Sequence, residues 1–148
     1  MKLHSDSSPG LNTVTGYDEH GIEINRQSYA HAIFFAPEGE VHAWAVARVD
    51  DITAETLRAI TGLDKAAASP MDFLDDTPPQ RPDDAPEVVL VGTGARQHLL
   101  SPETTRPLLR AGIGVEAMST HAAARTYNIL MAEGRRVLVA LLPQEINE

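Results

Sequence analysis

Cysteine is absent from this 148-residue chain, and aromatic residues make up only 5% of it. Without cysteine there is no disulfide framework, no thiolate nucleophile and no cysteine-based metal site. With so few aromatic side chains, we expect a core built mainly from Val, Ile, Leu and Ala. Hydrophobic residues account for 43% and charged residues for 22%, which is typical of a globular protein. The length favours a single domain over residues 1–148.

Long apolar runs are also absent. The run at 137–142 is far shorter than the roughly 20 residues that span a bilayer, so we expect no membrane insertion. Residues 1–10 contain no Arg, one Asp and no apolar run, which is unlike a signal or transit peptide. We therefore expect a cytoplasmic protein, with 1–10 as a frayed lead-in and 144–148 as a loose tail.

Positive charge is scarce in the first part of the chain. Residues 1–86 contain 15 acidic and 6 basic residues, residues 87–148 contain 6 of each, and the net charge is −9. Nucleic acid and anionic membranes repel such a surface, so we expect no nucleic-acid partner.

Strand patterns fill the first third of the chain. They are found at 11–17, 22–24, 30–35 and 41–46. Turns at 18–21 and 37–40 separate them, which indicates β-hairpin segments in an antiparallel or mixed sheet. The alternating segment 41–46 is a candidate edge strand, and a homo-oligomer formed through that edge is one alternative.

Residues 64–86 form a loop rich in Pro and Asp. They hold five of the ten prolines, and six acidic against two basic residues. Proline excludes a helix here and disfavours a strand. Two interpretations stay open: a solvated excursion, or a surface that binds a protein partner. In the second interpretation the apolar contacts are Met71, Phe73 and Leu74.

Strands alternate with helices in the last part of the chain. Apolar strand patterns lie at 88–91, 112–116 and 136–142. A helix is predicted between each pair, and the order strand, helix, strand, helix, strand indicates parallel strands joined by crossovers. The sequence therefore predicts a C-terminal β-α-β-α-β unit.

Three helices have recognisable ends. The predicted starts are Thr53, Ser101, and either Ser119 or Thr120. Each is a residue type that caps helix N-termini, and Gly62 and Gly134 end the first and third helices. Pro107 removes a backbone donor from the second helix, so we expect a break or a kink there.

Three stretches carry a family resemblance. They read VLVGTG at 89–94, GIGVEAMST at 112–120 and AARTYNILMAEGRRVLVALL at 123–142. The spacing between Thr126-Tyr127-Asn128 and Glu133-Gly134-Arg135 is the most specific part. The chain resembles the domain of unknown function 498 family, which includes the mitochondrial respiratory complex I assembly factor 3 and bacterial relatives.

The resemblance implies a fold and a kind of function. It implies a three-layer α/β fold with a mixed central sheet, and a non-enzymatic assembly or protein-interaction factor with a protein partner. A bacterial cytoplasmic member is the expected identity. The family supplies no catalytic residue and no cofactor to carry over, and we expect neither.

An alternative is a small-molecule or anion site, or an enzyme, at the turn Gly92-Thr93-Gly94. Backbone N–H groups in a Gly-rich turn after a strand can bind an anion. The candidate ligand-binding residues are Gly92, Thr93, Gly94, Arg96, His98, Arg125 and Asn128. The nucleotide fingerprint GxGxxG is incomplete, because Gln97 stands at its third glycine. The turn is also compatible with a purely structural role.

Structural interpretations stay open for the side chains of this set. Arg125 could pair with Glu116 or Glu133, and Asn128 could bond to nearby backbone. No two of the six His residues have metal-ligand spacing such as HExxH, so we expect no metal site. No Ser lies in a nucleophile elbow, and no catalytic residue is predicted.

Overall fold

The computed structural model describes residues 10–18, 21–63 and 84–143. Most of the lead-in expected at 1–10, most of the loop expected at 64–86, and the tail at 144–148 lie outside the described residues.

The described chain forms eight strands, three helices and one short 3₁₀ turn. The strands are β1 Val14–Asp18, β2 Gly21–Ile24, β3 Gln27–Tyr29, β4 Ile33–Phe35, β5 His42–Ala43, β6 Val88–Gly92, β7 Gly114–Met118 and β8 Val137–Leu141. The helices are α1 Ala54–Thr61, α2 Pro102–Arg110 and α3 Thr120–Ala132, with the 3₁₀ turn η1 at Val49–Asp51.

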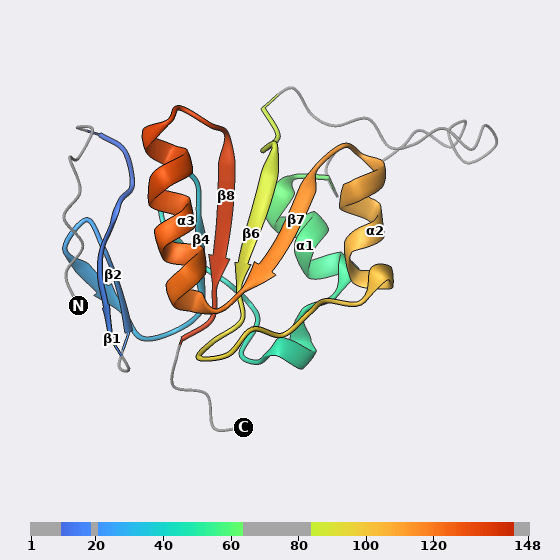
Figure 1. Cartoon of the computed structure of the whole chain (residues 1–148), viewed down its shortest axis with the longest axis horizontal. Helices are drawn as coiled ribbons and strands as arrows, with labels where there is room; N and C mark the ends of the chain where they lie inside the picture. The colour runs from blue at the N-terminus through green and yellow to red at the C-terminus, as the bar shows by residue number, and fades with distance from the viewer. Residues whose placement is uncertain (1–9, 19–20, 64–83, 144–148) are drawn as a thin grey trace.

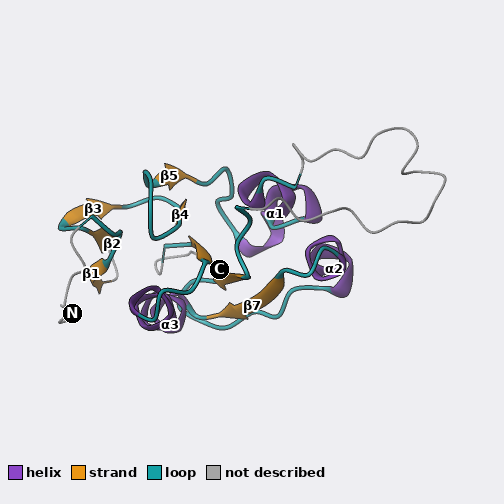
Figure 2. Ribbon diagram, turned by 90° about the horizontal axis from the view of Figure 1, so that it is seen from above, coloured by secondary structure: helices purple, strands orange, loops and turns teal. Residues whose placement is uncertain are grey.

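The elements are arranged in three layers. A five-stranded sheet, in the order β5-β4-β8-β6-β7, lies in the middle. Helices α1 and α2 lie on one side of it, and α3 with the antiparallel sheet β1-β2-β3 lies on the other (Figures 1 and 2). Strands β6, β7 and β8 are parallel, whereas β4 runs antiparallel to β8 and to β5. The predicted α/β class, the mixed central sheet and the C-terminal β-α-β-α-β unit are confirmed.

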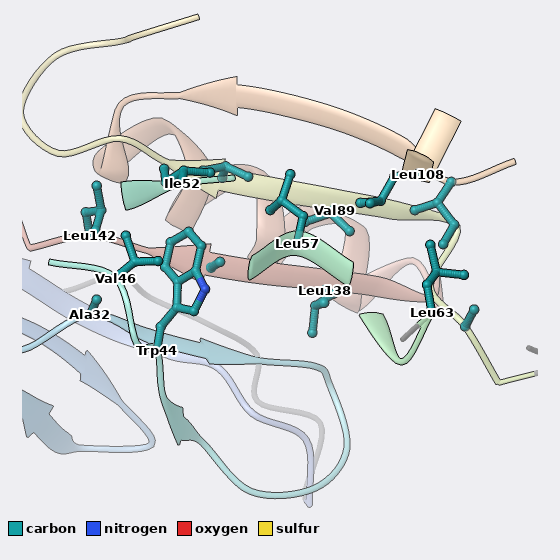
Figure 3. Close-up of a cluster of buried hydrophobic side chains, with 14 of the residues drawn as sticks. Ala32, Trp44, Val46, Ile52, Leu57, Leu63, Val89, Leu108, Leu138 and Leu142 are labelled. Atoms are coloured by element: carbon teal, nitrogen blue, oxygen red, sulfur yellow. The ribbon is translucent and has the colours of Figure 1, made fainter. Parts of the chain in front are cut away.

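The apolar runs predicted at 88–91 and 136–142 form the central strands β6 and β8. All five residues of β8 and four of the five in β6 are buried, as expected of parallel strands covered on both faces. On the α1 side, the core cluster includes Trp44, Leu57 and Leu138. Figure 3 shows Trp44 reaching from the chain after β5 toward Leu57 of α1.

The N-terminal sheet contains one strand that the sequence pattern missed. Asn25 and Arg26 both have positive φ, 51° and 69°, and they turn β2 directly into β3. A two-residue turn of this kind matches the twist of a hairpin. Arg26 is an unusual residue for this conformation, so the turn carried no Gly signal. The predicted first hairpin is confirmed, because β1 pairs antiparallel with β2. The middle of its predicted turn, residues 19–20, lies outside the described residues.

The predicted strand at 41–46 is wrong in extent. Only His42 and Ala43 pair with β4, although Trp44 N–H still donates to Ala32 C=O at 2.9 Å. Beyond that point the side chains of Trp44 and Val46 are buried in the core. Burying them draws the chain off the sheet edge, which leaves a very short edge strand of the sort that limits edge-to-edge pairing.

The helix caps follow the predicted residue types. Thr53 and Ser101 cap α1 and α2, and Ser119 rather than Thr120 caps α3. A break at Pro107 is wrong, because α2 continues to Arg110. Proline removes only its own N–H donor, and the following turn is still closed by Ala111 N–H bonding to Pro107 C=O at 3.2 Å.

Candidate functional site

The turn at Gly92–Gly94 lies at the carboxyl ends of the parallel strands, where it meets the start of α3. A Cβ atom on Gly92 would lie 2.7 Å from Leu141 Cδ2 and 3.0 Å from Thr120 Cα. Only glycine lets the helix start approach this closely. Gly92 C=O also accepts a bond of 2.9 Å from Leu142 N–H. The turn is therefore packed tightly against its surroundings.

The hydroxyl of Thr120 joins three segments at this corner. Its Oγ1 accepts from Gly94 N–H at 2.9 Å and donates to Leu142 C=O at 2.7 Å. Thr120 N–H in turn donates to Gly94 C=O at 2.8 Å. Thr120 is fully buried, so these bonds are shielded from water and expensive to lose. The N–H of Gly94, the donor that an anion nest needs, is engaged inside the protein.

Thr93 is engaged in the same way. Its N–H donates to Met118 C=O at 2.8 Å, and its hydroxyl lies 2.6 Å from Arg96 C=O. The same hydroxyl accepts from His98 N–H at 3.0 Å. Thr93 is fully buried, and it shapes the loop that follows the turn. The structure thus brings Gly92, Thr93 and Gly94 together with Thr120 in one internal network.

The charged candidates Arg96 and His98 join this network only through backbone groups in the bonds above. The side chains of Arg96 and Arg125 are exposed, and His98 is half-buried. Within the described residues Arg125 forms no ion pair with Glu116 or Glu133, so neither of these possible pairings is observed. Gln97, between Arg96 and His98, donates from Nε2 to Ala117 C=O at 2.9 Å.

Asn128 and Tyr127 fasten α3 to the N-terminal sheet. The Asn128 side chain accepts from Val14 N–H at 3.0 Å and donates to Val14 C=O at 2.9 Å. Tyr127 is fully buried, and its hydroxyl donates to Asn12 C=O at 2.7 Å. Burial raises the pKa of the Tyr127 phenol far above its ordinary value, so it stays protonated. The alternative of a backbone bond at Asn128 is thus the one observed.

His121 stands at the start of α3 beside the side chain of Tyr17. The two ring centroids are 3.9 Å apart. The His121 ring keeps much of its exposure to solvent, but partial desolvation lowers its pKa below the ordinary value of 6.5, and the positive charge of Arg125 lowers it further. Since the folded state disfavours the charged imidazole, acidification below the ordinary pKa is expected to reduce stability.

An NMR titration of His121 checks this expectation. In the wild type its pKa should fall below 6.5, and Arg125→Gln should raise it by removing a neighbouring positive charge. Arg58→Gln, on α1 across the sheet, is the matched control and should leave the titration unchanged. A wild-type pKa at or above the ordinary value contradicts the burial argument.

A wide hollow lies at the opposite edge of the sheet, where β6 and β8 begin. Its volume is about 950 Å³, and it is open to solvent. Apolar groups from five segments make up much of its lining: Leu11, Ala36, Pro37, Ala59, Ile60, Pro86, Met131, Val137 and Leu138. Charged residues also line it, namely Glu38, Asp84, Arg135 and Arg136.

One of the charges at the rim of the hollow, that of Arg135, is balanced by an ion pair with Glu87. Arg135 Nη2 lies 3.2 Å from Glu87 Oε2, and Arg135 Nε donates to the same oxygen at 3.2 Å. The bond from Arg136 N–H to Glu87, together with Arg135, holds the pKa of Glu87 below its ordinary value. Gly134 and Arg135 belong to the EGR motif, so this motif borders the hollow.

The sequence patterns predict neither the hydrogen bonds of the Thr120 hydroxyl to Gly94 and Leu142 nor the hollow. The pattern around Thr120 indicates only a possible helix N-cap. The hollow combines residues from positions 11 to 138, and a linear pattern does not reveal such a set. The position of the EGR motif, at the predicted end of a helix, is the one available signal.

The three-layer arrangement recurs in solved structures. The solution structure of a Bordetella pertussis protein, described as a Mth938-like domain, is 59% identical with a TM-score of 0.76; the match covers 97% of this chain and 93% of that one. A crystal structure from Bordetella parapertussis is 56% identical with a TM-score of 0.74, covering 93% and 99%. The fold is thus that of a Mth938-like domain.

The chain belongs to the family described as protein of unknown function DUF498/DUF598, whose model matches residues 14–142. NADH dehydrogenase [ubiquinone] 1 alpha subcomplex assembly factor 3 of Bos taurus is 29% identical over 143 residues, which are 97% of this chain and 67% of the bovine protein. The Danio rerio protein of the same name is 28% identical over 141 residues, covering 95% and 69%. The predicted family is confirmed.

Two kinds of feature are absent from the described residues. No helix there is long and apolar enough to cross a membrane. No group of three or more His, Asp or Glu residues there is arranged to hold a metal ion.

Proposed function

We propose that this protein is a non-enzymatic assembly or protein-interaction factor that binds a protein partner at the hollow. The similarity to complex I assembly factor 3 supports this class of function. The observation that carries the proposal is the hollow itself, which is wide, open, lined by many apolar groups and edged by charges of both signs. An apolar surface with a polar rim is the usual form of a protein-binding patch.

The hydrogen bonding of the Gly92–Gly94 turn supports the same proposal. The N–H groups of Thr93 and Gly94 and the hydroxyl of Thr120 all have partners within the protein. An anion bound there would have to displace these bonds. A protein partner at the other edge of the sheet requires no such rearrangement.

Replacing Ala59 by Arg tests the hollow. Ala59 is exposed and lines the hollow, so a long charged side chain there should block a partner while changing stability by no more than about 0.5 kcal/mol. Ala95→Arg, at an exposed position beyond the Gly corner, is the matched control. Affinity purification of the tagged full chain from its native host should recover a partner with wild type and Ala95→Arg, and at least tenfold less with Ala59→Arg.

The identity of that partner decides the role. If the protein assists assembly of respiratory complex I, deleting its gene in a host that has the complex should lower the amount of intact complex on native gels. Recovery of no stable partner, together with normal levels of the complex after deletion, rejects the proposal.

A small-anion site remains the second candidate, on one observation. Arg96 and Arg125 are exposed and form no ion pair among the residues that the structure describes. A ligand at about 100-fold above its Kd stabilises a protein by about 2.7 kcal/mol, which a thermal-shift screen detects easily. Phosphates, nucleotides and carboxylates should give no shift if the partner at the hollow is the function, and a shift abolished by Arg96→Gln would support the anion site.

A further inference from the structure

An exposed stripe runs along the outer side of α3. It consists of Arg125 and Ile129 of α3 and of Glu133, the residue that caps the C-terminal end of the helix. They are spaced four residues apart and therefore lie on one side of it. Ile129 is 59% exposed, an unusual amount for a large apolar side chain on a helix that otherwise packs its apolar groups inward. Within the described residues neither Arg125 nor Glu133 forms an ion pair.

The surface beside this stripe is only partly covered. Helix α3 packs mainly against β6 and β8, so it leaves β7 at the edge of the sheet. In Figure 2, α3 and β7 lie next to each other along one margin of the molecule. Glu116 of β7 is exposed, and Met118 is half-buried. Helix α2 also packs against β7, so the part of β7 that stays open is the stretch around Glu116, beside the stripe. We call this stretch the β7 shelf, and a further helix could lie on it.

The stripe is complementary to itself. A helix rises about 1.5 Å per residue, so Arg125 and Glu133 lie about 6 Å to either side of Ile129 along the axis. When two such helices pack antiparallel about a two-fold axis at Ile129, each Arg125 faces the Glu133 of the other copy. The two isoleucines then meet at the centre, with an opposite-charge pair on each side.

We propose that a second copy of this chain docks on this surface, with α3 packing antiparallel to α3. Residues four apart form ridges that interdigitate in the commonest class of helix–helix packing. Two-fold symmetry is also the commonest symmetry of soluble homo-oligomers, and it requires a self-complementary patch. The charge order along the stripe supplies that complementarity, which is the argument for a second copy over an unrelated protein.

The strength of the dimer follows from its size and charge. One helix pair with part of the β7 shelf buries less surface than the roughly 1,200–2,000 Å² of standard stable complexes. Two copies with a net charge of −9 each also repel one another, although salt near 0.15 M screens charges beyond about 8 Å. The dimer is therefore a reversible one, whose population rises with protein concentration.

Charge reversal at the two ends of the stripe tests the geometry. Arg125→Glu places two acidic residues on every stripe, and Glu133→Arg places two basic ones. Each variant alone should weaken self-association at least tenfold, as measured by sedimentation equilibrium on the full chain. The double variant Arg125→Glu with Glu133→Arg keeps opposite charges at the two ends, so it should dimerise like the wild type. A mixture of the two single variants should form a heterodimer, detected by native mass spectrometry.

Two further variants separate docking from folding. Ile129→Asp should abolish the dimer while the thermal midpoint stays near that of the wild type, because the side chain is exposed. Arg58→Glu reverses a charge on α1, across the sheet, and should leave the dimer unchanged. A wild type that stays monomeric at high concentration, or single variants that dimerise as well as the wild type, would overturn the proposal. So would the absence of a heterodimer in the mixture.

Discussion

Replacing Thr120 by Val is expected to lower the free energy of unfolding by about 2–4 kcal/mol. Valine has nearly the same shape, so the substitution removes the hydroxyl without leaving a large cavity. Gly94 N–H then loses its bond of 2.9 Å, and Leu142 C=O loses its bond of 2.7 Å. Each buried backbone group left without a partner costs about 1–3 kcal/mol, because it has given up water and received nothing in return.

Urea unfolding followed by circular dichroism measures this effect. Thr120→Ser is the control, since it keeps the hydroxyl and removes one buried methyl group, at a cost of about 1 kcal/mol. If Thr120→Val proves no more destabilising than Thr120→Ser, the two hydrogen bonds of the hydroxyl do not stabilise this corner. A large loss of unfolding free energy in Thr120→Val alone also means that internal hydrogen bonds keep the Gly92–Gly94 turn from accepting an anion.

The double variant Tyr127→Phe with Asn128→Ala is expected to lower the free energy of unfolding by about 2–5 kcal/mol and to loosen the N-terminal sheet in particular. Phenylalanine keeps the ring against Phe35, whose centroid lies 4.9 Å away, but leaves Asn12 C=O without this donor. Alanine removes both bonds to Val14. These bonds join elements more than 100 positions apart in sequence, so little local structure compensates for their loss.

Hydrogen exchange shows where the loosening occurs. Amides of β1 and β2 should exchange faster in the double variant, whereas those of β6 and β8 should keep their protection, because their ladders are untouched. Ala132→Gln, at an exposed position on the same helix, should alter stability by no more than about 0.5 kcal/mol. A uniform loss of protection across both sheets would contradict a local clamp and indicate a global role for the two residues.

The C-terminal unit could be predicted because its signals are local. A strand buried on both faces is a continuous apolar run, as in β6 and β8, and helix ends are marked by capping residues within one turn. Ser119 and Gly134 illustrate this for α3. The family could also be identified here, because the motifs lie in these same segments.

The candidate site was harder to predict because side-chain partners are not local. The pattern placed Asn128 near the Gly corner, yet its amide is engaged by Val14, on the other side of α3. The partner was hidden because it is a backbone group, and every residue carries one. Likewise, β3 was missed because its turn uses Arg26 at a positive φ, where glycine is the usual signal.

The way the two sheets are joined affects how the molecule can vary. Within the described chain no strand ladder connects the three-stranded N-terminal sheet to the central sheet. The two sheets share contacts with helix α3 and bonds such as those of Asn12 to the bend at 36–39. Strands β1–β3 thus form a separate layer that is attached to the central sheet mainly through α3. Homologues could therefore differ in the length or sequence of these three strands without losing any hydrogen bond of the central sheet. The condition is that Tyr127 and Asn128 still bond to backbone groups of the N-terminal segment.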